Sequence, residues 1–443
     1  MRSLIARLRA DDPTGRALVT NFAGGVSLQL TLLVSGVVLT RSLGPTNRGN
    51  LALLILVSAI ASQLGGLGIP YALTYATARM PAAARRTLAL VWRPIGVQAL
   101  IAAVVAMAAL GVLTIGRPDY VKIGAATTAV AIAATVYERC GLGILQGLRR
   151  FLSFNLLRNA SNMIFSAVAA VLWLSDNHDF LAYAISWSVC QAIVAPFALW
   201  FAARAAAAVE GDAAPPLSRR RLFRFGRRSL FGGDPPVETY RLDQAAIAVF
   251  LAPASLGFYV AAIAFTNLPR FIAQSFSLVA TPTVASRGDH REAVATMWRF
   301  FWLALPFYLS LAALLWLAAP TLTDFFFGPA FARSAGISRI LLVASALYCA
   351  RRVLSDSARG AGYPAIGSIA EIASLAAALP AFAISIPIWG LDGVAYSLVV
   401  SSAIALSVLV VGIRRLTSIG TVPETWRRTK AEESVQPPIP AGV

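Results

Sequence analysis

The sequence predicts an all-α, polytopic membrane protein with about twelve transmembrane helices. Of its 443 residues, 58% are hydrophobic and only 13% are charged, and the mean hydropathy is +0.70. A soluble domain carries about 25% charged residues. Apolar runs of about 20 residues, the length that crosses a bilayer as a helix, recur along almost the whole chain. Basic residues collect between these runs on alternate connectors, which is typical of membrane proteins.

Helix-breaking residues separate the apolar runs and set the approximate limits of each span. Examples are the pairs Gly44-Pro45, Ala252-Pro253 and Gly328-Pro329. In chain order, the predicted spans are 18–41, 49–77, 87–114, 121–146, 152–174, 180–204, 230–252, 256–285, 296–320, 334–357, 364–387 and 391–415.

The basic residues predict the orientation, because Lys and Arg near span ends are retained on the cytoplasmic side. With the N-terminus inside, 28 Lys and Arg fall in cytoplasmic segments and six fall outside. The N-terminus, MRSLIARLRA, precedes a long apolar segment without a convincing cleavage site, so we expect a retained first span. The chain is therefore predicted to lie in the cytoplasmic (inner) membrane, with both termini in the cytoplasm.

The longest connector divides the predicted spans into two halves. Residues 205–229 form a basic cytoplasmic linker between an N-terminal six-helix lobe, 18–204, and a C-terminal six-helix lobe, 230–415. A basic cytoplasmic N-terminus (1–17) and a tail expected to be disordered (416–443) flank the lobes.

A short connector recurs once in each half. Residues 43–50 read LGPTNRGN and residues 251–258 read LAPASLGF, with Leu, Pro and Gly at matching places. Each copy joins the first and second span of its half, and each half starts on the same side of the membrane. We therefore predict a parallel repeat whose two halves superpose; the alternative is that any tight turn between helices uses Pro and Gly.

The positions of the basic residues, cysteines and histidines disfavour several function classes. The net charge is +18, but the basic residues do not form a patch with interleaved aromatics in a soluble segment. No nucleic-acid partner is therefore expected. The three cysteines lie in apolar runs and are expected to be free, buried thiols. The two histidines lie in different short loops, so no metal site is expected.

Polar residues in the spans are costly, at about 2.5–3.5 kcal/mol for an Arg at mid-membrane, and so each needs a physical reason. In span 8 five polar residues are spaced 3, 4, 3 and 4, which places them on one helical face. This face, which we expect to meet protein or water, consists of Asn267, Arg270, Gln274, Ser277 and Thr281.

Spans 7, 5, 4 and 11 also carry polar residues. In span 7, Gly and Pro near FGGDPPVETYRLDQ make a regular helix unlikely, and Glu238 and Arg241 share one face while Asp243 points roughly the other way. Two interpretations stay open: ion pairs that hold helices together, or a water-filled path. The same choice applies to Glu138, Arg139 and Arg158, and to the span 5 face of Asn155, Asn159, Asn162 and Ser166.

No catalytic constellation, nucleotide cradle or metal-ligand cluster emerges from the sequence. The predicted outside loops are nearly all shorter than about twelve residues and leave little room for an active site there. The sequence therefore favours a carrier and predicts that the protein is not an enzyme.

The chain resembles the Wzx-type oligosaccharide flippases, polysaccharide biosynthesis proteins of the multidrug/oligosaccharidyl-lipid/polysaccharide (MOP) exporter superfamily. The resemblance covers nearly all of residues 18–415 and implies a MATE/MOP-like fold, in which two six-helix lobes enclose a cavity that alternates between the faces of the membrane. The stretches that carry it are LTRSLGPTNRGNLALL, YRLDQAAIAVFLAPASLGFYVAA, FFFGPAFARSAGISRILL and ARGAGYP.

The resemblance also implies a substrate and a set of site residues. The expected activity is the export of undecaprenyl-pyrophosphate-linked oligosaccharide for lipopolysaccharide or exopolysaccharide of the cell envelope, with cationic residues holding the pyrophosphate. Arg241 with Asp243 matches the family's Arg-x-Asp, and Arg270 lies where a cavity cation is expected. The predicted pyrophosphate ligands are Arg270, Arg241 and Arg158, and the predicted cavity lining is Asn267, Gln274, Ser277, Asn155, Asn159, Asn162, Glu238 and Asp243.

No cofactor is expected apart from a coupling ion, H+ or Na+. The expected partners are the polyprenyl-pyrophosphate-linked glycan, membrane lipids, and the polysaccharide polymerase and glycosyltransferases that act on the same glycan. Three alternatives stay open: a cation-coupled drug exporter of the same fold, a membrane-embedded glycosyltransferase or polymerase, and a structural scaffold in an envelope complex.

Overall fold

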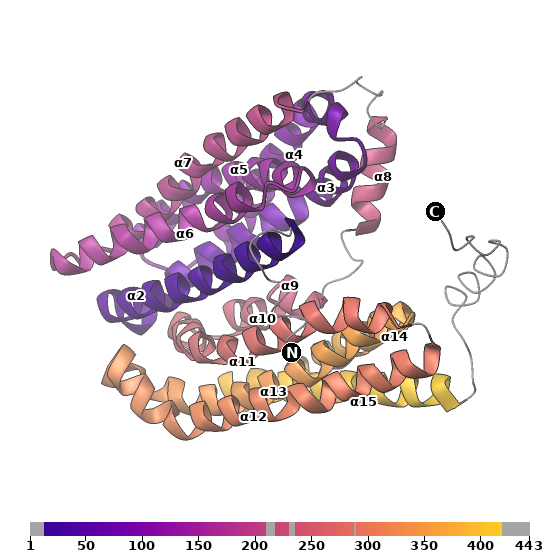
Figure 1. The fold of residues 1–443 in the computed structure, drawn as a ribbon. Coiled ribbons are helices and arrows are strands. Elements are labelled where there is room, and N and C mark those ends of the chain that lie inside the picture. The colour runs from indigo at the N-terminus through magenta and orange to yellow at the C-terminus, as the bar shows by residue number, and fades with distance from the viewer. Residues whose placement is uncertain (1–12, 210–217, 230–234, 288, 419–443) are drawn as a thin grey trace, which may run out of the picture. The chain divides into compact units, whose positions relative to one another are not determined.

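The computed structural model describes residues 13–209, 218–229, 235–287 and 289–418, and within these ranges the chain is helical and contains no strand. The predicted N-terminal segment up to residue 12, residues 210–217 of the linker, the start of the seventh predicted span (230–234) and the tail from residue 419 lie outside the described residues. The helices (Figure 1) are α2 (Pro13–Gly65), α3 (Ile69–Arg79), α4 (Ala84–Leu113), α5 (Asp119–Gly147), α6 (Phe151–Leu174), α7 (Phe180–Ala207), α8 (Arg219–Ser229), α9 (Pro236–Thr239), α10 (Leu242–Phe250), α11 (Pro253–Ala285), α12 (His290–Phe327), α13 (Ala332–Gly360), α14 (Pro364–Trp389) and α15 (Leu391–Ser418), with short 3-10 helices η1 (Pro81–Ala83) and η2 (Pro329–Phe331).

The prediction of an all-α, multi-pass membrane protein is confirmed. Within the described residues, ten helical segments are long and apolar enough to cross a membrane. Two differences explain why the described residues form ten such segments and the sequence predicts twelve spans. The first two predicted spans merge into one segment, Ala23–Gly65, and the seventh predicted span is broken into the short helices α9 and α10.

Helix α2 runs through the predicted connector because the chain bends there without leaving helical geometry for more than one residue. Gly44 has φ 66° and ψ 175°, which lies outside the helical region, and Pro45 follows it inside the helix. Glycine adopts positive φ without steric cost, and proline has no N–H to contribute to the helix. The connector at 43–50 is therefore a kink between two apolar segments.

The contacts divide the described chain into two compact units. Unit 1 comprises the described residues up to Ala264 together with Leu322–Ser334, and unit 2 comprises Phe265–Thr321 with the described residues from Ala335 onward. The boundary falls inside α11, so the lobes 18–204 and 230–415, and their superposition, stay predictions.

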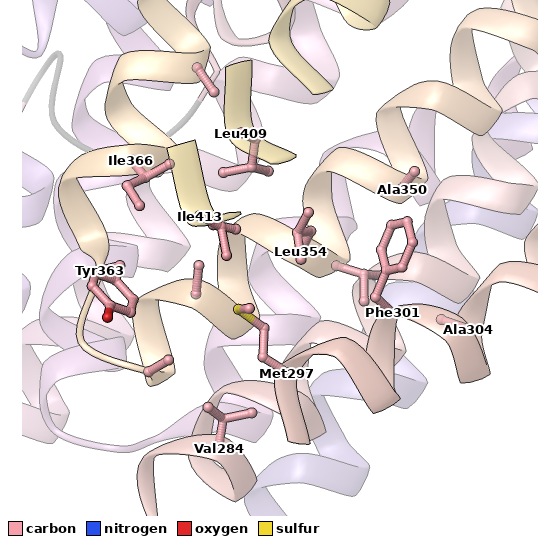
Figure 2. Close-up of a cluster of buried hydrophobic side chains, with 14 of the residues drawn as sticks. Val284, Met297, Phe301, Ala304, Ala350, Leu354, Tyr363, Ile366, Leu409 and Ile413 are labelled. Carbon is pink, nitrogen blue, oxygen red and sulfur yellow. The ribbon is translucent and has the colours of Figure 1, made fainter. Parts of the chain in front are cut away.

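In unit 1, α3, α4, α5 and α7 share one apolar core, to which α8 contributes Leu222. The predicted linker is thus partly a helix that packs on the bundle. In unit 2, α11, α12, α13 and α15 enclose a second core, in which Phe301, Leu354 and Ile413 meet (Figure 2). The three cysteines are buried and free, as predicted.

The two copies of the recurring connector pack against each other within unit 1. A Cβ on Gly49 would overlap with the carbonyl oxygen of Pro253, and a Cβ on Gly257 would overlap with the carbonyl oxygen of Pro45. Each glycine therefore admits the backbone of the other connector. The recurring connectors at 43–50 and 251–258 therefore contact each other through their backbones. Two tight turns with no other role would not need this contact.

Candidate functional site

Four basic residues remain at membrane depth once the predicted cytoplasmic and outside Lys and Arg are set aside: Arg139, Arg158, Arg241 and Arg270. The first three lie in unit 1 and the fourth in unit 2. Each unit therefore has its own cations: Arg139, Arg158 and Arg270 are half-buried, and Arg241 is exposed.

Unit 1 holds a polar cavity of about 360 Å³ between α2, α3, α5, α6 and α7. Glu138 and Arg139 reach it from α5, Arg158 and Asn162 from α6, and Gln191 from α7. These side chains come from helices that are otherwise apolar, so a polar compartment lies inside a bundle of membrane-spanning helices.

Among the residues that the structure describes, the cations of this cavity form no ion pair, although Glu138 lies next to Arg139 in the chain and the two interact electrostatically. Neither Arg139 nor Arg158 forms an ion pair with a residue that the structure describes, and the Nε of Arg158 is buried without a hydrogen bond. The Arg158 guanidinium lies over the Phe154 ring, 5.3 Å from its centroid. Glu138 is 5% exposed and, within the described chain, makes neither an ion pair nor a hydrogen bond. Because these charges do not neutralise one another by contact, they stay available to a ligand.

A broken helix opens onto the same cavity. The chain leaves α2 at Gly65 and starts α3 at Ile69, with Leu67 and Gly68 both at positive φ. Gly68 and Pro70 line the cavity, so the N-terminus of α3 borders it. A helix N-terminus carries unpaired N–H groups and a partial positive charge that favour anions. In α3 the Ile69 N–H already donates to the carbonyl of Gly66 and Pro70 has no N–H, so the break contributes the helix dipole more than free donors.

Arg241 marks a second break, in the predicted seventh span. It is the N-cap of α10 with φ 48° and ψ 48°, a left-handed conformation that costs roughly 1–2 kcal/mol for a residue other than glycine. Arg241 interacts electrostatically with Arg139, so it adds positive charge near the cavity. The expectation that a regular helix does not run through this span is confirmed.

The acidic residues of this span lie on either side of the break. Asp243, in the first turn of α10, accepts a hydrogen bond from the hydroxyl of the fully buried Tyr259. Glu238 lies in α9 and is half-buried. The carboxylate of Asp243 thus helps to hold α10 against α11.

The span 5 asparagines divide between two environments. Asn159 donates from Nδ2 to the carbonyl of Gly24 at 2.8 Å, which ties α6 to α2. Asn155 donates to the carbonyl of Phe151 at 2.9 Å within α6 and lies against Gly24. Only Asn162 of the three lines the cavity described above. Interhelical contact and cavity lining, the two interpretations of this face, therefore both occur.

In unit 2, Arg270 lies beside an aromatic and ionic cluster on α13. Its guanidinium sits over the Tyr348 ring, 4.5 Å from the centroid, and the guanidinium of Arg351 lies 5.2 Å from the same ring centroid. Arg351, 1% exposed, pairs with Glu371 of α14 at 2.8 Å. Within its unit and among described residues, Arg270 makes no ion pair, and its buried Nε has no hydrogen bond.

The predicted polar face of α11 is present but is not uniformly buried. Ser277 is buried, Asn267 is half-buried and Gln274 is exposed. At the end of the face, Thr281 donates to the carbonyl of Asp356 at 3.0 Å, which joins α11 to α13. This face therefore combines packing contacts with exposed polar groups.

Six residues of these clusters are absent from the predicted site residues: Glu138, Arg139, Gln191, Tyr348, Arg351 and Glu371. The sequence predicts Arg351 to be a cytoplasmic loop cation because Arg351-Arg352 lies near the predicted end of a span, whereas α13 continues to Gly360 and buries Arg351. The spacing of Arg270 gives no sign of Tyr348, because the two residues meet only in the folded chain. The charged pair Glu138-Arg139 inside an apolar span is the sequence signal that points to this cavity.

Comparison with known proteins gives a family and a fold. The sequence profile of the polysaccharide biosynthesis protein family matches residues 38–336. No curated protein matches the chain at significant similarity.

Solved structures with similar folds include MATE family transporters and a lipid II flippase. An inward-facing multidrug resistance MATE family transporter of the MOP superfamily has a TM-score of 0.67 and 18% identity over 88% of this chain and 95% of its own. The lipid II flippase MurJ, in an inward closed conformation, has a TM-score of 0.65 and 14% identity over 91% of this chain and 88% of its own. An outward-facing MATE transporter of the MOP superfamily has a TM-score of 0.57 and 17% identity, covering 94% of this chain and 98% of its own.

These likenesses show that the chain has the fold of MOP-superfamily transporters, as predicted. Because the family profile covers more than half of its length, the chain belongs to the polysaccharide biosynthesis protein family.

Proposed function

We propose that this protein transports a polyprenyl-pyrophosphate-linked oligosaccharide across the cytoplasmic membrane by alternating access. The observation that carries the proposal is the polar cavity in unit 1, where neither Arg139 nor Arg158 forms an ion pair with a described residue and the N-terminus of α3 lies alongside. Membership of the polysaccharide biosynthesis protein family supports a glycan as the cargo.

The chemistry of the cavity suits a pyrophosphate diester. Such a group carries two negative charges and oxygen acceptors, and it needs fixed positive charge to enter a medium of low dielectric constant. Arginine presents a planar set of donors that matches phosphate oxygens. Interrupted helices that point an N-terminus at an anionic substrate are a known device in membrane transporters.

The test is to remove one cavity cation and measure export. We expect Arg158→Ala to lower the initial rate of lipid-linked oligosaccharide transport in proteoliposomes on the order of 10- to 100-fold, since hydrogen bonds to a charged group contribute about 1.5–3 kcal/mol. Arg158→Lys should recover part of the rate, because it keeps the charge and loses the planar fork. Arg85→Ala, at an exposed position of α4, is the matched control and should leave the rate unchanged.

A second candidate function is a cation-coupled drug exporter. The buried carboxylate of Glu138, which lines the same cavity, favours it, and so does the fold shared with the MATE transporters. An exporter of cationic drugs depends on a cavity acid, whereas a carrier of pyrophosphate depends on the cavity arginines.

The two functions predict opposite rankings of two variants. For the glycan carrier, Arg158→Ala should lose far more transport than Glu138→Gln. If Glu138→Gln abolishes efflux of a cationic dye while Arg158→Ala leaves it intact, the drug exporter is correct. Imposed H+ and Na+ gradients in the same proteoliposomes would identify a coupling ion. Appearance of a new glycosidic product from lipid-linked sugars would instead favour the glycosyltransferase or polymerase.

A further inference from the structure

Helix α8, in the connector that follows α7, has one apolar face that is already occupied. Leu222 is 1% exposed in the core of unit 1, and the Phe225 ring stacks on Tyr75 of α3, with centroids 4.6 Å apart and planes at 18°. Gly226, one turn after Leu222, lies against Gly68. The helix is thus docked on α3 and runs across the ends of the long helices of unit 1 (Figure 1).

The other face of α8 is basic and exposed with respect to the described residues. Arg220, Arg224 and Arg227 are spaced 4 and 3 residues apart, which places them together on the side away from Leu222. All three are exposed, as are Arg219 and Arg221, and none of the five forms an ion pair with a described residue. Five neighbouring cations repel one another, so this face gains from an anionic partner.

The position of α8 identifies that partner. The helix follows a membrane-crossing segment, Phe180–Ala207, and is not itself one of the apolar segments that could cross. It is therefore held at the membrane surface, where clusters of four to eight Lys or Arg attract anionic lipid heads. We propose that the arginine face of α8 binds the head groups of anionic phospholipids.

The apolar face of α8 packs against residues next to the polar cavity, so it connects the lipid-binding face with that cavity. A Cβ on Gly68 would overlap with the carbonyl oxygen of Gly226, and a Cβ on Gly226 would lie 2.9 Å from the carbonyl oxygen of Leu67. Leu67 and Gly68 form the break before α3, and Gly68 lines the cavity. Lipid binding to α8 therefore acts on the wall of the cavity, and this consequence rests on the proposed transport function.

The lipid contact is tested by a binding measurement that does not depend on transport. The full-length protein in neutral detergent is titrated with phosphatidylglycerol or phosphatidylcholine, and bound lipid is counted by native mass spectrometry. We expect preferential binding of phosphatidylglycerol that falls on the order of tenfold or more in Arg220→Gln/Arg224→Gln/Arg227→Gln. The control Arg85→Gln/Arg93→Gln/Arg299→Gln removes the same charge from exposed positions elsewhere and should bind normally. Equal loss in both triple variants, or no loss in the α8 variant, overturns the proposal.

Salt and a competing protein segment provide further outcomes. Binding should weaken as ionic strength rises, because the Debye length shortens from about 10 Å at 0.1 M to about 3 Å at 1 M. An acidic peptide that displaces phosphatidylglycerol at equal charge concentration would identify a protein as the better occupant and overturn the assignment.

The coupling to the cavity is tested with Gly226→Ala, which keeps every arginine and disturbs the contact with Gly68. We expect this variant to bind phosphatidylglycerol normally and to lose the dependence of transport on that lipid. Phe225→Leu, which removes the ring stacked on Tyr75, should act in the same way if Gly226→Ala does not fold. Unchanged lipid dependence in the variants overturns the coupling. Absence of any transport by the unaltered protein would contradict the proposed function and leave the lipid-binding result standing.

Discussion

At the scale of the residue, the described cations differ in what surrounds them. Arg351 is buried and paired with Glu371, whereas Arg270 shares the Tyr348 ring with Arg351 and has no ion-pair partner in its unit among described residues. A paired buried cation serves mainly to join helices, because removing its partner leaves an uncompensated charge. A cation that rests on an aromatic face keeps its outer donors for a ligand.

The first residue-scale prediction concerns Arg270. Arg270→Ala should abolish glycan export and leave protein abundance in the membrane unchanged, and Lys should rescue export only in part because it lacks the bidentate fork. Surface glycan is measured together with membrane abundance. If export returns in Arg270→Ala with Glu238→Gln, or with Asp243→Asn, then Arg270 is a structural ion-pair partner and not a pyrophosphate ligand.

The second residue-scale prediction concerns the Arg351–Glu371 pair. Glu371→Leu should destabilise the protein by about 3–5 kcal/mol, because it leaves Arg351 charged, buried and without its carboxylate. Arg351→Met with Glu371→Leu should recover much of that loss. Thermal unfolding in detergent of the single and double variants measures the coupling, and additive losses would show that the pair contributes little.

At the scale of the element, the recurring connectors show how two kinked segments come close together. Gly49 and Gly257 each admit the backbone of the other connector. Nearby, Arg41 of α2 donates to the carbonyls of Phe325 and Phe326 at the C-terminal end of α12, at 2.8 Å for Phe326. A cation at a helix C-terminus is favoured by the partial negative charge there. The two glycines therefore let the connectors pack together, and Arg41 joins α2 to the end of α12 beside them.

The element-scale prediction is that a single methyl group disrupts this contact. Gly49→Ala should destabilise the protein by about 1–3 kcal/mol, the usual cost of overpacking, because its Cβ would overlap with the Pro253 carbonyl. Gly36→Ala is the matched control: it lies in the same helix with no atom within 4 Å of the added Cβ. It should be neutral or stabilising, since alanine favours helix over glycine by about 1 kcal/mol. Equal midpoints of thermal unfolding for the two variants would argue against the contact.

At the scale of the whole molecule, the distribution of Lys and Arg predicts the topology. Twenty-eight basic residues fall on one predicted side and six on the other, and this bias recurs at nearly every connector. Arg351, which the structure buries, is one of the 28, and the bias does not depend on it. Both termini and the linker containing α8 are therefore expected on the cytoplasmic side.

The whole-molecule prediction uses reporter fusions. A reporter that works only in the cytoplasm should be active when fused after Val443 or inserted in the 210–217 segment, and inactive when inserted at Arg117-Pro118. Activity of a periplasmic reporter after Val443 would reverse the topology and the side on which α8 meets lipid.

The sequence by itself determined the fold class. The length of each apolar run and the basic residues at its ends are local properties, which can be read from that segment alone. It also marked the kink at Gly44-Pro45, because glycine and proline disfavour regular helix there, whereas the breaks at Gly68 and Arg241 appear only in the structure.

Only the tertiary structure decided how those elements meet. It brought Arg139 and Arg158 from separate helices to one cavity, and it divided the asparagines of α6 between helix packing and cavity lining. It also buried Arg351 against Glu371. Periodicity assigns a residue to a face of its own helix, but the identity of the facing helix depends on contacts between residues far apart in the chain, which no local pattern encodes.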